Sequence, residues 1–244
     1  ESIPKKLLII GGGYIGLEMA TFYNAVGSEI EIAEFQSTIL SEMDKDLVDV
    51  LINKLGKKVN FMTNTKVSSV LDNQKSCRVD FESKGEIIQK NYDKVLLCVG
   101  RQPNTDKINI ESTGIETDKY GFINVNNQCR TLIPNIFAIG DVTGNPMLAH
   151  RATHQGKIAA EVIYGKKSIF EPESIPYVIF TDPEIAWSGP SEDQLMNQGI
   201  EFESKIFPWQ ANGRALSMDA SEGRTKILFC KKSKKILSIG IVGY

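Results

Sequence analysis

The sequence LLIIGGGYIGLEMA at residues 7–20 decides the expected fold of the first part of the chain, because it predicts a strand, a tight turn and a helix. Gly11, Gly13 and Gly16 fit the spacing G-x-G-x-x-G. The first glycine permits the turn, the second lets the backbone approach a pyrophosphate, and the third lets the helix pack on the strand. Phosphates there would face a helix N-terminus, where unpaired N–H groups and the dipole favour anions. We predict a dinucleotide site, against the alternative of an ordinary surface turn.

A carboxylate follows the second expected strand, where a dinucleotide site needs one. Residues 29–33 predict that strand, and Glu34 follows it, roughly 20 residues after the glycines, as this kind of site requires. A carboxylate accepts hydrogen bonds from both hydroxyls of an adenosine ribose but repels a 2′-phosphate. Residues 35–38 carry no positive charge. We therefore expect NAD rather than NADP, against the alternative that Glu34 is a solvated carboxylate at a strand end.

The composition is that of an ordinary globular protein. The chain has 244 residues, of which 41% are hydrophobic and 24% are charged, and this length suffices for two domains. No apolar run approaches the roughly 20 residues of a membrane span, and the first 20 or so residues lack the features of a secretory signal. The net charge of −2 comes without a basic stripe. We expect a cytoplasmic protein without nucleic-acid or membrane partners, in which the lysine-rich residues 231–235 form a hairpin turn.

The cysteines and histidines form no recognisable metal or redox motif. The four cysteines lie far apart and include no C-x-x-C, so reduced thiols are expected, with Cys98 in the core of a buried strand at residues 94–99. His150 and His154 have the spacing of two metal ligands on one helix face. No acidic or thiol third ligand is evident beside them, and we predict no metal site.

Further elements complete the first expected domain. Residues 46–55 predict a helix ended by Gly56. Short strands are expected at residues 59–62, 66–71, 78–82 and 86–90, with an alternating pattern that suggests an antiparallel meander. The strand at residues 94–99 then completes the sheet. The expected order is strand, helix, strand, helix, strand, meander, strand, in one α/β domain over residues 1–100.

The next two segments differ from the first domain in their pattern of expected elements. Residues 101–171 are broken by glycine and proline but contain an expected buried strand at 136–139 and an expected helix at 148–164, capped by Gly165. The apolar face of that helix consists of Ile158, Ala159, Val162 and Ile163.

Residues 172–244 open with prolines that we interpret as spacers. A capping box over residues 191–194 predicts a short helix, and strands at 201–208, 226–229 and 236–242 give an α+β pattern. The sequence ends directly after a hydrophobic strand, which we interpret as truncation.

Four ordered motifs together resemble the FAD-dependent pyridine nucleotide disulfide oxidoreductases, over essentially the whole chain. They lie at residues 11–18, 99–104, 136–141 and 147–150. Within that family, residues 147–150, 180–184 and 207–215 are most similar to the dihydrolipoamide dehydrogenases. The resemblance implies a homodimeric enzyme that reoxidises dihydrolipoamide on the lipoyl domains of 2-oxo acid dehydrogenase complexes, passing electrons through a disulfide and FAD to NAD. Alternatives are a mercuric or glutathione reductase type of enzyme, or a non-catalytic nucleotide-binding module.

The resemblance also implies the fold and the site residues. It predicts a Rossmann-like α/β NAD-binding domain with an antiparallel meander at residues 1–100, a central FAD-contacting segment at 101–171, and the start of an α+β dimerisation domain at 172–244. It places near NAD the residues Gly11, Gly12, Gly13, Tyr14, Ile15, Gly16, Glu18, Glu34, Val67, Val99, Gly100 and Arg101. It places near FAD the residues Asp141, Met147, Leu148, Ala149 and His150.

Individual roles carried over by the resemblance keep structural alternatives. Val67 would lie in a loop beside the adenine, and Glu18 would lie near the nicotinamide amide or be a solvated acid. Tyr14 would cover the nicotinamide pocket or be a partly buried aromatic. Arg101 would border the NAD or be an exposed, salt-bridging side chain. Asp141 would bind the ribityl chain of FAD or cap a turn.

The groups that carry out the chemistry of the family are missing from this sequence. It contains no C-x-x-x-x-C pair, and neither histidine is followed by glutamate in a late segment. Without a thiolate relay or a general base, the nucleophilic and proton-transfer steps have no residues to perform them. We therefore assign no catalytic residue, and expect the central part of a longer enzyme that binds NAD but does not turn over.

Overall fold

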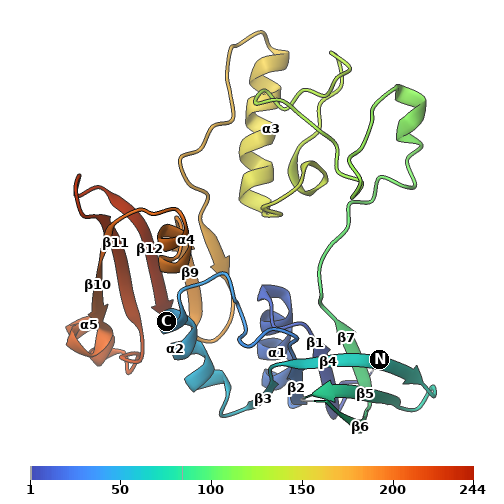
Figure 1. Cartoon of the computed structure of the whole chain (residues 1–244), viewed down its shortest axis with the longest axis vertical. Helices are drawn as coiled ribbons and strands as arrows, with labels where there is room; N and C mark the ends of the chain where they lie inside the picture. The colour runs from blue at the N-terminus through green and yellow to red at the C-terminus, as the bar shows by residue number, and fades with distance from the viewer. Residues whose placement is uncertain (1, 84) are drawn as a thin grey trace. The chain divides into compact units, whose positions relative to one another are not determined.

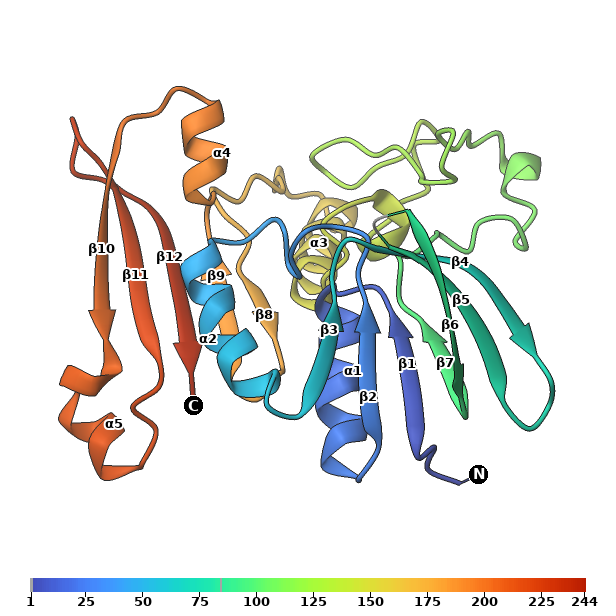
Figure 2. The same ribbon diagram turned by 60° about the horizontal axis from the view of Figure 1, so that its bottom comes forward.

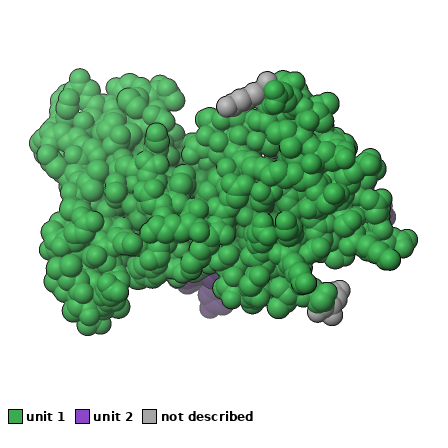
Figure 3. Space-filling view, turned by 90° about the horizontal axis from the view of Figure 1, so that it is seen from below, with its two compact units in different colours: residues 1–99, 176–244 green, residues 100–175 purple. Residues whose placement is uncertain are grey.

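The chain folds into two compact units. The computed structural model describes residues 2–83 and 85–244. One unit combines residues 1–99 with residues 176–244, and the other consists of residues 100–175 (Figure 3). Within the described residues, no helix is both long enough and apolar enough to cross a bilayer.

A parallel sheet forms the centre of the first unit and confirms the expected α/β arrangement. Its strands are β1 (Lys6–Ile10), β2 (Glu29–Ala33), β3 (Val59–Met62) and β7 (Lys94–Leu97), in the order β3-β2-β1-β7 (Figure 2). The crossovers contain α1 (Tyr14–Ala25) and α2 (Lys45–Leu55). The order places β1 in the middle of the sheet, so the turn that follows β1 lies at the carboxyl ends of neighbouring parallel strands, where open α/β sheets bind ligands.

Both faces of this sheet are buried, as the continuous apolar run of β1 requires. Leu7 and Ile9 point to one face and pack with α1 and α2, while Leu8 between them points to the other face. That second face packs against Val79 and Phe81 of the meander. The glycine-rich turn therefore starts from a strand that is fixed on two sides.

The meander consists of β4 (Thr65–Asp72), β5 (Cys77–Ser83) and β6 (Glu86–Tyr92), paired antiparallel in that order. Of the four short strands expected in this region, residues 59–62 instead join the parallel sheet as β3, beside β2. A polar network ties the meander to the sheet, because the Glu31 carboxylate of β2 accepts hydrogen bonds from the Tyr92 hydroxyl and from Lys90. Burial, and then the bond to Glu31, raise the pKa of Tyr92.

The expectation of a buried strand over residues 94–99 is wrong at its end. The strand β7 ends at Leu97, whose side chain is 67% exposed, and Cys98 follows it half-buried. The reason is the position of β7 at the edge of the sheet, where one side has no neighbouring strand. Cys98 still donates its N–H to the carbonyl of Ile10, and burial raises the pKa of its thiol.

A five-stranded antiparallel sheet completes the first unit. It has the order β10-β11-β12-β9-β8, with β8 (Tyr177–Ile179), β9 (Glu184–Ser188), β10 (Phe202–Pro208), β11 (Arg224–Cys230) and β12 (Ile236–Gly243). The helices α4 (Glu192–Asn197) and α5 (Gly213–Ser217) and the short 3₁₀ helix η3 (Trp209–Ala211) lie between its strands in sequence. The capping box at Ser191 and the hairpin turn near residues 231–235 are confirmed.

The strands β8 and β9 were not expected, because prolines flank them. Pro176 and Pro183 each stand directly before the first residue of a strand. At that place a missing N–H does not interrupt the hydrogen-bonded ladder. The prolines therefore introduce strands here, and Pro176 is also the first residue after the boundary between the two units.

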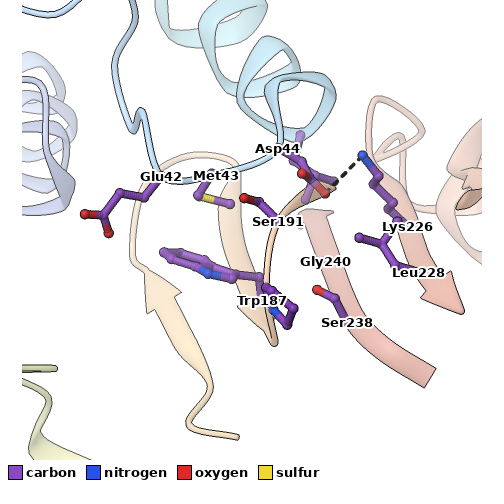
Figure 4. Close-up of a pocket in the computed structure, with 11 residues that line it drawn as sticks. Glu42, Met43, Asp44, Trp187, Ser191, Lys226, Leu228, Ser238 and Gly240 are labelled. Atoms are coloured by element: carbon purple, nitrogen blue, oxygen red, sulfur yellow. Dashed lines mark ion pairs between the residues drawn. The ribbon is translucent and has the colours of Figure 1, made fainter. Parts of the chain in front are cut away.

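A buried lysine fastens the part of this unit that contains the parallel sheet to the antiparallel sheet. Lys226 of β11 is 4% exposed at its side chain and forms an ion pair with Asp44 at 3.0 Å (Figure 4). It also pairs with Asp46 at 2.9 Å and with Glu192 at 2.8 Å. Asp44 is the residue before α2, and its other oxygen accepts the N–H of Glu192. We call these four residues the Lys226 cluster. It joins the start of α2, the start of α4 and the middle of β11.

The second unit is built around one helix (Figure 1). This helix, α3 (Ala149–Ile163), is followed by Gly165 with φ +97°, and the N–H of Gly165 bonds to the carbonyl of Val162, which confirms the predicted cap. Ile158, Ala159 and Val162 are buried as expected. Ile163 is 67% exposed, so its assignment to the apolar face is wrong.

The buried strand expected at residues 136–139 is not formed. In residues 100–175, all of which the structure describes, Phe137 makes only an isolated bridge to Arg130, and Ile139 is 41% exposed. A strand needs a neighbour along its length, and the chain on both sides turns away at Pro134 and at Gly140, which has φ +74°. The 3₁₀ helices η1 (Ile110–Thr113) and η2 (Gly140–Thr143) are the other regular elements of this unit.

Candidate nucleotide-binding sites

Two glycines of the first turn are required by packing. Gly11 has φ +107°, and a Cβ there would lie 2.5 Å from the carbonyl oxygen of Cys98. A Cβ on Gly16 would lie 2.1 Å from the carbonyl oxygen of Gly11. Both distances are far below van der Waals contact, so α1 can start this close to β1 and β7 only with glycine at these positions.

Gly13 is a glycine for another reason, since a Cβ there would meet no protein atom within 4 Å. It is exposed, and it stands directly before α1 without a side chain that caps the helix. The first N–H groups of α1 therefore face an open side of the turn at the positive end of the helix dipole. This arrangement suits an anion such as a pyrophosphate.

The Glu34 carboxylate is held against the same turn. Its Oε2 accepts the N–H of Gly12 at 2.6 Å, and its Oε1 accepts the N–H of Gln36 at 2.7 Å. A Cβ on Gly12 would lie 2.7 Å from Ile39 Cγ2 and 3.1 Å from Glu34 Oε2, so Gly12 permits this close approach. Each carboxylate oxygen has a second lone pair for a further donor. Glu34 is therefore oriented by the backbone and can still accept from a ribose.

The residues that follow the glycines lie along α1. Tyr14 and Ile15 are half-buried, and Tyr14 packs at the edge of the main core. Glu18 is also half-buried, and its Oε1 accepts the N–H of Phe180 at 3.0 Å. This bond brings the segment at residues 180–184, with its buried Thr181, to α1.

The two valines expected near NAD lie in different surroundings. Val67 is half-buried in β4 opposite Phe81, within the strand that the local pattern predicted at residues 66–71 and not in the loop that the resemblance implied. It packs with the cluster on the meander side of the sheet. Val99 is 67% exposed, directly after the Cys98 carbonyl that contacts the glycine turn.

The second unit brings together three of the expected site residues. Arg101 Nη1 donates to the carbonyl oxygen of Met147 at 3.0 Å and lies 3.5 Å from Asp141 Oδ2. Gly100 before it has φ +146°. A groove of about 510 Å³ lies at this place, and its lining consists of Arg101, Gln102, Pro103, Asn104, Asp141, Val142 and Met147. The motifs at residues 99–104, 136–141 and 147–150 therefore meet at one groove.

The remaining expected residues lie at the start of α3. Leu148 precedes the helix without a side-chain cap, and Ala149 and His150 are its exposed first residues. Asp141 is in the first turn of η2, with a side chain that is 55% exposed. Backbone N–H groups and one carboxylate therefore face outward from the same short segment.

Sequence reasoning missed the residues that hold this segment. Arg151 is 8% exposed and Gln155 is 3% exposed, and both bind the turn at residues 140–146. One signal was available: a cation in the first turn of a helix opposes the dipole and therefore needs other partners. The Lys226 cluster was also missed, because its members are far apart in sequence.

Among the cysteines and histidines, only the Cys98 backbone, beside Gly11, and His150, at the start of α3, belong to the candidate sites. All four cysteines are free thiols. The ring of His154 packs edge-on against Phe170, with 5.0 Å between the ring centroids. Over residues 2–83 and 85–244, the structure contains no group of three or more side chains suited to a metal ion.

Models of two domain families match the chain. The model described as pyridine nucleotide-disulphide oxidoreductase matches residues 1–156. The model of the dimerisation domain of the same proteins matches residues 175–244.

Curated proteins and solved structures give similar matches. A dihydrolipoyl dehydrogenase of Haemophilus influenzae is 45% identical over 243 residues, which are 100% of this chain and 51% of the relative. One from Geobacillus stearothermophilus is 40% identical over 99% of this chain and 52% of the relative. The chain spans about half the length of the curated relatives it matches. The HOCl-induced flavoprotein disulfide reductase RclA from Escherichia coli has a TM-score of 0.89 at 28% identity, over 99% of this chain and 55% of its own.

Proposed function

The chain belongs to the pyridine nucleotide-disulfide oxidoreductases, and on that premise we propose that the protein containing it is a dihydrolipoyl dehydrogenase that uses FAD and NAD. The identity of 45% to an enzyme of that name supports this activity over a mercuric or glutathione reductase type. The chain's own contribution is cofactor binding, because its sequence holds no C-x-x-x-x-C pair.

We assign NAD to the turn at residues 11–16. The observation that carries this assignment is the combination of an open Gly13 with a Glu34 carboxylate held on Gly12. The N–H groups at the start of α1 bind the pyrophosphate, and Glu34 accepts from the adenosine ribose. The other assigned NAD contacts are Tyr14, Ile15, Glu18, Val67, Val99, Gly100 and Arg101.

We assign FAD to the segment at residues 141–150. Asp141 accepts from the ribityl hydroxyls, and the N–H groups around Met147, Leu148, Ala149 and His150 face the pyrimidine edge of the flavin. The groove beside Arg101 offers hydrogen-bond donors on the guanidinium of Arg101 and acceptors on the carboxylate of Asp141. Its chemistry therefore fits a polar cofactor chain. When bound, FAD supplies two-electron transfer between a dithiol and NAD. The positive end of α3 favours negative charge at that edge.

The partners and the organisation follow from the same membership. The match to a dimerisation domain over residues 175–244 supports a homodimer, and the proposed activity requires lipoyl domains as partners. We keep the division into an NAD-binding domain at 1–100, a FAD-contacting segment at 101–171 and an interface domain at 172–244. A cytoplasmic location fits the proposed enzyme.

The test measures cofactor choice and activity in the complete gene product that contains this sequence. We expect dihydrolipoamide-dependent reduction of NAD and weaker binding of NADP. Glu34→Gln should weaken NAD binding roughly 10- to 100-fold, since hydrogen bonds to charged groups contribute about 1.5–3 kcal/mol. Glu29→Gln is the matched control, because Glu29 starts the same strand but pairs with Lys6 at the surface. Unchanged NAD binding in Glu34→Gln, or no activity with dihydrolipoamide, would contradict the proposal.

A further inference from the structure

The turn between residues 140 and 146 is fastened to α3 by one buried guanidinium. Arg151 Nη1 donates to the carbonyl oxygens of Gly144 at 2.7 Å, Gly140 at 3.3 Å and Pro146 at 3.3 Å. Its Nη2 donates to Thr143 Oγ1 at 3.0 Å. A single side chain therefore contacts the beginning, the middle and the end of this turn.

The next helical turn adds a second attachment. Gln155 lies four residues after Arg151, on the same face of α3. Its Oε1 accepts the N–H of Gly140 at 2.8 Å, and Arg151 binds the carbonyl of that same glycine. A Cβ on Gly140 would lie 3.0 Å from Ala152 Cβ, so the backbone also approaches the helix closely. The peptide groups on both sides of Gly140 are therefore fixed from α3.

This placement is costly for the helix itself. A cation in the first turn faces the positive end of the helix dipole, and a charge that is 8% exposed has lost most of its water. The four oxygen acceptors replace that water in a planar, forked arrangement that arginine can satisfy and a lysine ammonium matches less well. Arg151 therefore stabilises the conformation of the turn at residues 140–146 and does not stabilise α3.

Two residues of the candidate FAD groove depend on that shape. Asp141 follows Gly140 directly, and Met147 follows Pro146 directly, so each is adjacent to a carbonyl that Arg151 holds. Arg101 contacts both Asp141 and the Met147 carbonyl. If the turn relaxed, the carboxylate and the first N–H groups of α3 would lose their common orientation.

We propose that Arg151 is a positioning residue for FAD, which holds Asp141 and the start of α3 in the geometry that the flavin cofactor needs. This inference rests on the proposed function, because it assumes that residues 141–150 contact FAD. Arg151 acts through the turn at residues 140–146, and Gln155 and Thr143 support it.

The test reconstitutes the complete gene product, stripped of flavin, with FAD. Arg151→Met should weaken FAD binding roughly 10- to 100-fold, as expected when several hydrogen bonds to a charged group are lost together. It should also shift the visible absorption band of the bound flavin. Arg151→Lys should restore part of both, since an ammonium can still donate to some of the carbonyls. NAD binding should not change.

Two further variants keep the test decisive if Arg151→Met does not fold. Lys157→Met removes a positive charge from the same helix at an exposed position and should leave FAD binding unchanged. Thr143→Val keeps the side-chain volume but removes the acceptor of Nη2, and should weaken FAD binding several-fold even if Arg151→Met does not fold.

The outcomes separate the two proposals. Failure of the unaltered protein to bind FAD would contradict the proposed function. FAD binding by the unaltered protein with equal affinity and spectrum in Thr143→Val and in whichever Arg151 variants fold would overturn the role of Arg151. A loss in Arg151→Met that Arg151→Lys does not reduce at all would point to a purely structural role and also overturn it.

Discussion

The two candidate cofactor segments differ in how the turn before the helix is held in place. Each places the start of a helix beside a tight turn, with N–H groups facing outward. The first turn is held by backbone contact, because Gly11 and Gly16 let main-chain atoms approach where any side chain would clash. The second turn is held by side chains, because Arg151 and Gln155 bind its peptide groups from α3.

The difference shows what each solution requires. Backbone contact needs a strand on each side to fix the turn, and β1 has two parallel neighbours. Residues 136–139 make only an isolated bridge, so the second turn lacks that support within its own unit, whose residues 100–175 are all described. A buried cation with loop oxygens as acceptors supplies the missing constraint.

The largest expected effect comes from the other buried cation, Lys226, whose acceptors are carboxylates instead of carbonyls. Lys226→Met should lower the free energy of unfolding by about 3–5 kcal/mol, since carboxylates would be left together without their cation. Urea unfolding measures this change. Lys6→Met, which removes an exposed partner of Glu29, should change it by less than about 1 kcal/mol. Equal effects of the two variants would contradict a buried role for Lys226.

A pair of glycine variants separates packing from ligand space in the first turn. Gly16→Ala should destabilise the fold by about 1–3 kcal/mol, because the added Cβ meets the Gly11 carbonyl. Gly13→Ala should leave stability within about 0.5 kcal/mol, since its Cβ meets no protein atom, but should weaken NAD binding. Urea unfolding and NAD titration of both variants make the comparison. The reverse pattern would show that Gly13 is the packing position.

Low pH should weaken the stabilising interactions of Lys226 but not those of Arg151. Burial by itself raises the pKa of Glu192, but its hydrogen bonds with Lys226 and Ser204 outweigh this, and the pKa is lowered from 4.5. Glu192 therefore adds stability above pH 4.5 that is lost as the pH falls below that value, whereas the carbonyls around Arg151 do not titrate. Between about pH 6 and about pH 3, the free energy of unfolding should fall less steeply in Lys226→Met than in the unaltered protein. Parallel curves would contradict this coupling.

The smallest expected effect concerns Arg101. Its contact with Asp141 at 3.5 Å is partly exposed, so Arg101→Met should change the free energy of unfolding by no more than about 1 kcal/mol. FAD binding should weaken more clearly, because the groove loses the donor to Met147. Calorimetric unfolding and FAD titration test the two parts. A large loss of stability would show that Arg101 holds the turn together with Arg151.

Local patterns in the sequence predicted much of the first unit. Strand, turn and helix around Gly11, the helix at residues 46–55 and the capping box at Ser191 all depend on near neighbours, and the structure confirms them. The exposed edge at β7, the strands after Pro176 and Pro183, and the reduction of the strand expected at residues 136–139 to an isolated bridge were not foreseen. Each depends on which distant segment lies beside it, and no local pattern carries that information.

The sequence by itself determined the glycine turn, its acidic partner and the family, since the steric and charge requirements of a dinucleotide act over a few adjacent residues. Only the tertiary structure decided that Glu34 is fastened to Gly12, that Lys226 joins β11 to the starts of α2 and α4, and that Arg151 holds the second turn. A buried charge is stable only where several oxygen atoms converge on it, and that convergence exists only after the chain has folded.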